Sequence, residues 1–130
     1  IGLAVAHPDM ARILHKVRPM YEIGALSANV LENMLDHADA VQASVARILD
    51  GKDWFIGELR AMGYEVLAGH GNFMHVAFGE DGPAIHAALT GRVLYRQDFP
   101  HSVLAGYSRF STAPRKIMEE VGGIIRNAAR

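Results

Sequence analysis

The sequence predicts an α/β domain of the α+β type, in which helices cover one small mixed sheet. Three observations lead to this prediction. Apolar residues recur at helical spacings near both ends of the chain, short runs of β-forming residues occupy the middle, and glycine or proline stands between successive segments. Helices on one face of a sheet would bury the apolar surface of both. The expected order of elements is β-α-α-α-β-β-α-β-β-α.

The first 16 residues are predicted to form a strand followed by a short helix. The apolar run Ile1 to Ala6 is the strand, and it is far shorter than the roughly 20 residues that a membrane-spanning helix needs. Pro8 is predicted to start a helix that ends at Lys16, because proline is tolerated in the first helical turn. Since the chain starts without methionine and inside a predicted strand, we interpret the sequence as a fragment of a longer protein.

Two consecutive helices are expected between residues 25 and 63. From Ala25 to about Asp50 apolar residues recur at helical spacing, which predicts one long helix with Gly51 as its cap. Asp53 is expected to cap a second helix that ends at Gly63. The apolar face of this second helix consists of Trp54, Phe55, Leu59 and Met62.

Four strands and two further helices are expected in the second half of the chain. The strands, rich in aromatic and β-branched residues, are Tyr64 to Ala68, Asn72 to Phe78, Arg92 to Gln97 and Gly106 to Ser111. Gly69 and Gly71 mark the bend between the first two strands, and residues 98–105 form a loop. A short helix from Pro83 to Ala88 and an amphipathic helix after Pro114 complete the domain.

The composition excludes several classes of function. Half of the residues are hydrophobic, and 13 basic residues nearly balance 14 acidic ones, so the chain is neither disordered nor equipped with the charge that nucleic acid or an anionic membrane would require. The absence of cysteine excludes disulfides and a thiol nucleophile. It leaves the redox compartment open. We expect no nucleic-acid or membrane partner, and a cytoplasmic location is the starting assumption.

Histidine and glycine motifs offer no specific chemistry. The seven histidines include no H-x-x-x-H pair, so no metal site is expected. His70 and His75 are the closest pair, at a bend and in the following strand. Gly69-His70-Gly71 lacks the third glycine of a dinucleotide fingerprint and joins two extended segments, which favours a tight turn. A Ser-His-Asp hydrolase is not indicated either, because no G-x-S-x-G elbow is present.

Two arginines are the best candidates for a binding site. Arg96 and Arg109 each lie near the end of an expected strand, with a loop between them, so both guanidinium groups can face one site. The planar guanidinium pairs with a carboxylate or phosphate through two parallel hydrogen bonds. The alternative is that either arginine forms only a salt bridge with Asp98, Glu119 or Glu120.

Five segments of the chain resemble the histidinol-phosphate aminotransferases, a family of enzymes that use pyridoxal phosphate (PLP). The segments are Gly2 to Asp9, Val17 to Tyr21, Gly71 to Val76, Arg92 to Arg96 and Gly106 to Ser111. They occur in the family's order and cover nearly the whole chain. The resemblance implies that residues 17–130 are the small C-terminal domain of such an enzyme, and that residues 1–16 follow its large PLP-binding domain.

The resemblance also implies roles for four residues. Arg109 matches the arginine that binds the substrate carboxylate, and Arg96 would be a second anchor for a phosphate or a side-chain acid. Tyr21 and Asn72 would lie at the mouth of the active site. The chain departs from the family where Gln97 replaces a proline, and where Ser111-Thr112 replaces Gly-Thr.

The family's PLP-binding lysine lies upstream of the segment that matches Ile1. Lys16, Lys52 and Lys116 match no catalytic lysine. The resemblance therefore implies a parent enzyme with an amino-acid or 2-oxo-acid substrate, while this chain alone is expected to bind no PLP and to be inactive. A homo-oligomer is expected, because the predicted strand Ile1 to Ala6 lacks the sheet to which it would belong, and its apolar side chains and unpaired backbone groups favour pairing with another chain. The alternative interpretation is an independent α/β binding or dimerisation module without enzymatic activity.

Overall fold

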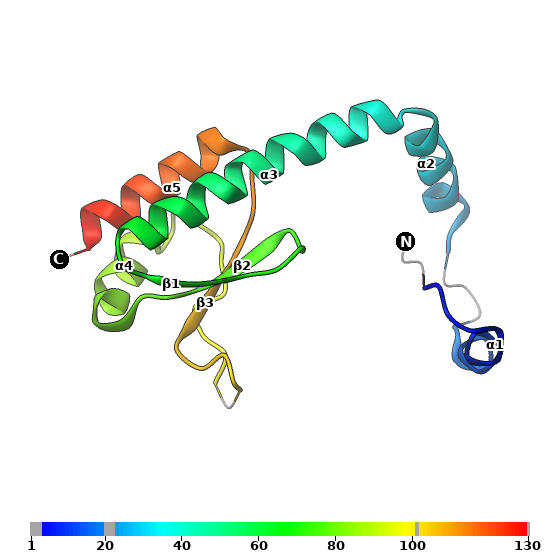
Figure 1. Cartoon of the computed structure of the whole chain (residues 1–130), viewed down its shortest axis with the longest axis horizontal. Coiled ribbons are helices and arrows are strands. Elements are labelled where there is room, and N and C mark those ends of the chain that lie inside the picture. The colour runs from blue at the N-terminus through cyan, green and yellow to red at the C-terminus, as the bar shows by residue number, and fades with distance from the viewer. Residues whose placement is uncertain (1–3, 20–22, 101, 130) are drawn as a thin grey trace. The chain divides into compact units, whose positions relative to one another are not determined.

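The computed structural model describes residues 4–19, 23–100 and 102–129 of the chain (Figure 1). The chain divides into two compact units, residues 1–42 and 43–130. None of the helices in the described ranges is long and apolar enough to cross a membrane. The predicted fold class is confirmed, because five α-helices accompany one small sheet.

The first unit consists of helices. The predicted helix at Pro8 is confirmed as α1 (Pro8–Val17), and the imidazole of His7 accepts a hydrogen bond from the backbone N–H of Asp9 at its start. Helix α2 spans Ala25–Asp36. Ile1 to Leu3 of the predicted first strand lie outside the described residues, and Ala4 to Ala6 are not a strand, since none of the described strands pairs with them.

The two helices expected between residues 25 and 63 begin and end at other positions. The helix predicted from Ala25 to Asp50 is interrupted at His37, and α3 then runs without a break over Ala38–Ala61. Gly51 and Asp53 lie inside α3 and are not caps. The reason is tertiary: Gly51 is buried against the backbone of residues 113–115, where a Cβ atom would lie 2.7 Å from the Arg115 nitrogen.

The sheet has three antiparallel strands in the order β1-β2-β3, instead of the predicted mixed arrangement. Strands β1 (Glu65–Ala68), β2 (Phe73–Ala77) and β3 (Tyr107–Ser111) confirm three of the predicted strands. The strand predicted at Arg92 to Gln97 is reduced to one bridge between Arg96 and Arg109. The N–H groups of Arg92 and Val93 bond the Leu89 carbonyl, so they continue a helical turn and do not extend a sheet.

Helices cover only one face of the sheet in the second unit (Figure 1). The helix expected at residues 83–88 is confirmed as α4 (Gly82–Leu89), preceded by the short 3-10 helix η1 (Gly79–Asp81), and the final helix is α5 (Arg115–Ala128). The buried core combines these helices with alternate strand residues, and its members are Phe55, Leu59, Val66, Met74, Val76, Phe78, Ile85, Leu89, Phe110, Met118, Val121 and Ile125. Within the described part of the second unit, no helix covers the other face of the sheet.

The environment of His86 leads to a prediction about stability and pH. Its Nδ1 atom lies 2.7 Å from the Tyr95 hydroxyl. Burial lowers the pKa of His86 below its ordinary value of 6.5, and the charge of Asp98 only partly opposes this shift. The unfolded chain therefore binds more protons than the folded chain just below pH 6.5.

We expect the free energy of unfolding to fall as the pH falls below 6.5. Urea titrations at about pH 7.5 and about pH 5.5 measure this change. The variant His86→Gln should be less stable at both pH values but should show a smaller difference between them. A difference as large as that of the unsubstituted chain would contradict the assignment to His86.

Candidate functional site

The uncovered face of the sheet carries one row of side chains that crosses all three strands. Leu67 pairs with His75, His75 pairs with Arg109, and Arg109 forms the bridge with Arg96. Residues directly opposite one another in antiparallel strands project to the same face. The four side chains therefore share the face that lies opposite the core.

Arg96 and Arg109 are brought together by their own backbones. The Arg96 N–H donates to the Arg109 carbonyl at 3.1 Å, and the Arg109 N–H donates to the Arg96 carbonyl at 2.8 Å. Such a hydrogen-bonded pair places the two Cα atoms about 5.5 Å apart. Both arginines are exposed, so two guanidinium groups can reach the same ligand from adjacent positions.

Aromatic rings support both guanidinium groups. The guanidinium of Arg96 lies 4.2 Å from the centre of the Phe99 ring, and that of Arg109 lies 5.6 Å from the centre of the Phe73 ring. The His75 ring contacts both phenylalanines edge to face, at 5.6 and 5.3 Å between centroids. These five residues, Phe73, His75, Arg96, Phe99 and Arg109, form the arginine–aromatic cluster.

The positive charge of the cluster has no carboxylate partner among the described residues. Arg96 Nε donates to the backbone carbonyl of Asp98 at 3.1 Å, and the Asp98 carboxylate accepts from the N–H groups of Phe99 and Gly106. Glu119 pairs with Arg115 at 2.9 Å. No ion pair between described residues uses Arg96 or Arg109. The salt-bridge alternative for these arginines is therefore not observed in the described ranges.

Burial and the nearby charge of Arg109 both lower the pKa of His75. Both effects favour the neutral form of the imidazole. A neutral ring adds no third cation beside the two arginines, and it can donate or accept one hydrogen bond.

Of the other two residues implied by the resemblance, only Asn72 can be placed. It is exposed and directly precedes β2, and its backbone carbonyl accepts a hydrogen bond from the Thr112 N–H at 2.9 Å. Asn72 thus lies beside Phe73 at the edge of the cluster. Tyr21 lies outside the described residues.

Sequence reasoning missed the aromatic members of the cluster. Phe73 and His75 alternate with buried Met74 and Val76 along β2, and this alternation could have placed them on one face. Only the register between β2 and β3 shows that this face also carries Arg109. Phe99 lies in an irregular loop, where no periodic pattern indicates the direction of a side chain.

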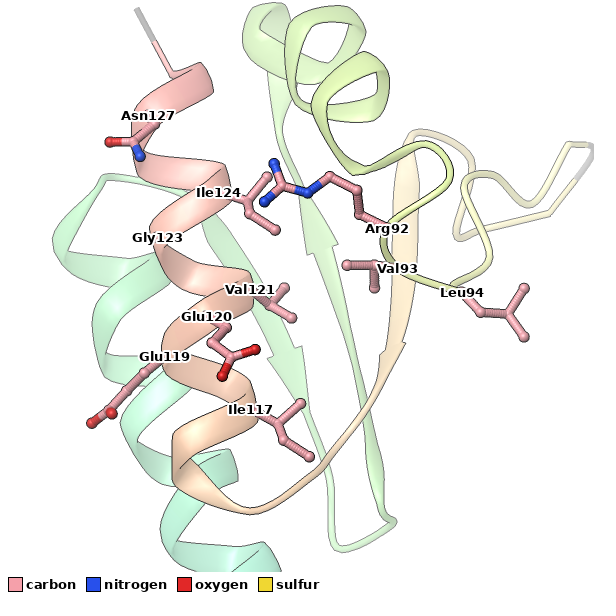
Figure 2. A pocket seen from close by; sticks show the side chains of 10 residues that line it. All are labelled: Arg92, Val93, Leu94, Ile117, Glu119, Glu120, Val121, Gly123, Ile124 and Asn127. Atoms are coloured by element: carbon pink, nitrogen blue, oxygen red, sulfur yellow. The ribbon is translucent and has the colours of Figure 1, made fainter.

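A groove of about 640 Å³ lies between α5 and residues 92–94. Figure 2 shows Val121 and Ile124 projecting from α5 toward the segment of Val93, with the Arg92 side chain extended toward Ile124. The groove contains neither Arg96 nor Arg109, and it is a surface distinct from the cluster.

A PLP site or a metal site makes specific demands on the lysines and the metal-binding side chains of the described residues. No group of three metal-binding side chains occurs within the described ranges. A PLP site needs an accessible lysine beside a phosphate cradle. Lys16 and Lys116 are exposed on helix surfaces, whereas Lys52 is buried and donates hydrogen bonds to two backbone carbonyls. None of the three fits the role of the PLP-binding lysine.

Comparison with known proteins supplies the family relationship. No family model matches the chain. The histidinol-phosphate aminotransferase of Syntrophotalea carbinolica is 31% identical over 121 residues, which cover 92% of this chain and 35% of that enzyme. The enzyme of the same name from Citrifermentans bemidjiense is 30% identical over 127 residues, which cover 97% of this chain and 36% of the enzyme.

The chain thus spans about a third of the length of the curated relatives it matches. The resemblance inferred from five segments is confirmed, because the matches extend over nearly all of the chain. The chain is therefore homologous, over nearly its whole length, to about a third of a histidinol-phosphate aminotransferase.

Proposed function

We propose that this chain is the substrate-recognition part of a PLP-dependent aminotransferase, which moves an amino group between an amino acid and a 2-oxo acid. Residues 17–130 would be its small domain, and residues 1–16 would follow the large domain. The observation that carries the proposal is the pair Arg96 and Arg109, adjacent on an exposed face and without a described carboxylate partner.

Arg109 would bind the substrate carboxylate. Its guanidinium donates no hydrogen bond within the described residues, and the Phe73 ring faces it at 5.6 Å. A ring beneath a guanidinium leaves the N–H edge available for a bidentate pair. The substrate would therefore approach Arg109 along the plane of its guanidinium.

Arg96 would bind a second anionic group of the substrate. Its Nε is occupied by the Asp98 carbonyl, so its terminal nitrogens remain for the ligand. Two cations about 5.5 Å apart at Cα suit a substrate with two acidic groups, a carboxylate together with a phosphate or a side-chain acid.

The remaining chemistry would come from PLP in the parent protein, where the cofactor serves as an electron sink for the substrate carbanion. Because none of the described lysines fits the cofactor, this chain alone would bind substrate weakly and transfer no amino group. Within the parent, its own residues would orient the substrate and exclude competing acids.

A chimera tests the proposal. The matching segment of the Syntrophotalea carbinolica enzyme is replaced by this chain, and amino transfer from histidinol phosphate to a panel of 2-oxo acids is measured. We expect transfer by the chimera and none by the isolated chain. A folded chimera that binds PLP but transfers no amino group to any acceptor would favour the independent-module alternative.

The apolar surface of α1 leads to a prediction about assembly. Met10, Ile13 and Leu14 share one helix face and are 51%, 57% and 46% exposed. Exposed apolar patches favour association, so we expect dimers or larger species of the isolated chain by light scattering. Ile13→Glu should raise the monomer fraction, whereas His15→Glu on the opposite face should not. Monomers at all concentrations would contradict the expectation.

A further inference from the structure

Lys52 stands out among the residues that the proposed function does not use. It lies on α3 with only 4% of its surface exposed. Its ammonium donates to the carbonyl of Gly69 and, at 2.7 Å, to the carbonyl of Gly71. The Lys52 ammonium therefore holds the turn between β1 and β2 through the two backbone carbonyls that flank His70.

The neighbour of Lys52 in the chain is also buried. Gly51 lacks a side chain, which lets α3 approach the backbone of residues 113–115 closely. A buried ammonium must be hydrogen-bonded, and no described carboxylate forms an ion pair with Lys52. The two turn carbonyls thus supply the partners that keep this cation in place.

The turn is in contact with the arginine–aromatic cluster. The Phe73 ring packs against Gly71 so closely that a Cβ atom there would lie 2.8 Å from the ring. The guanidinium of Arg109 lies 5.6 Å from the centre of the same ring. A continuous series of contacts therefore leads from the Lys52 ammonium through Gly71 and Phe73 to Arg109.

We propose that Lys52 is a positioning residue for the substrate site: by holding the Gly69–Gly71 turn, it fixes the Phe73 ring against the guanidinium of Arg109. The inference rests on the proposed role of Arg109 in binding the substrate carboxylate. Lys52 itself touches no substrate. Its effect is to restrict the orientations of Arg109 before the substrate arrives, which lowers the entropy cost of binding.

A purely structural lysine would stabilise the fold without affecting Arg109, so the test needs a readout besides stability. The variant Lys52→Met keeps most of the apolar stem and removes the ammonium, and Lys52→Arg keeps a charge with different geometry. Val121→Ala is the matched control, because Val121 is a buried core residue on α5 and its truncation lowers stability without contacting the turn.

The first measurement is NMR on the isolated chain at a temperature where all variants are folded. The Arg109 side-chain signals, assigned with Arg109→Lys, report the ring current of Phe73. We expect these signals to move in Lys52→Met, to move less in Lys52→Arg, and to stay in place in Val121→Ala. Unchanged Arg109 signals in both Lys52 variants would overturn the inference. If Lys52→Met does not fold, the Arg109 signals of Lys52→Arg are compared with those of Val121→Ala, and a shift in Lys52→Arg alone supports the inference.

The second measurement is kcat/KM in the chimera. Lys52→Met should lower it roughly tenfold, mainly through KM, which is less than the ~100-fold loss that a 1 Å misplacement can cause. Val121→Ala should leave it within about twofold. An equal kcat/KM in Lys52→Met and Val121→Ala would overturn the inference. If Arg109→Ala itself leaves kcat/KM unchanged, the proposed function is wrong. The NMR signals of Arg109 still report whether Lys52 positions this side chain, so the two failures can be distinguished.

Discussion

Replacing Arg109 by alanine in the chimera is expected to lower kcat/KM by about ten- to a thousandfold, since hydrogen bonds to charged groups contribute roughly 1.5–3 kcal/mol each. The substitution removes a guanidinium that no described carboxylate neutralises and that would form two such bonds with the substrate. Steady-state kinetics with the substrate varied at saturating acceptor measures the loss.

Two further variants make this result specific. Arg109→Lys should recover only part of the activity, because an ammonium supplies charge without the planar fork. Arg92→Ala is the matched control, since Arg92 lies over the groove beside α5 and outside the cluster (Figure 2), and it should leave kcat/KM nearly unchanged. A lowered melting temperature with normal kcat/KM in Arg109→Ala would show that Arg109 has only a structural role.

Gly51→Ala should be the most destabilising single-methyl change in α3. The new Cβ would clash with the Ala113 carbonyl and lie 2.7 Å from the Arg115 nitrogen. Both atoms belong to the backbone, so relief requires that the helix move away. Overpacking of this kind costs about 1–3 kcal/mol or more, and urea unfolding measures the loss.

Gly57→Ala provides the control within the same helix. A Cβ at Gly57 meets no atom within 4 Å, so alanine should stabilise the chain by about 0.5–1 kcal/mol through helix propensity. The two substitutions add the same methyl group and should differ in sign. Equal effects would contradict the close contact of α3 with residues 113–115.

The same glycine explains one limit of the sequence analysis. A glycine after a long apolar helical pattern is typical of a cap, and Gly51 with Asp53 fits that pattern. Only the contact with residues 113–115, more than sixty positions later, distinguishes a cap from a close helix approach. By contrast, α4 and α5 could be predicted because proline and local periodicity define their starts and their buried faces.

The candidate site could be predicted in part. The guanidinium chemistry and the resemblance indicated Arg96 and Arg109, and the structure shows them adjacent. Their supporting rings could not be predicted, because the direction of Phe99 depends on the loop after Gln97, and Phe73 joins the cluster through the register of two strands.

The burial of Lys52 was missed because the predicted helices ended at Asp50 and began again at Asp53. On the continuous helix α3, Lys52 lies three and seven positions before Phe55 and Leu59, on the same buried face.

Arg96 and Arg109 are held in the sheet to different extents, because within the described residues a single bridge is all that joins Arg96 to β3. Arg109 belongs to a strand that is paired along its length with β2, so its position is tied to the core. Arg96 joins the sheet at one point and is followed by an irregular loop, the kind of segment that tolerates insertions and substitutions. Under the proposed function, relatives with this fold would exchange the second anionic group that they recognise by altering residues 97–100 and 102–106, while the carboxylate contact proposed for Arg109 would be inherited unchanged.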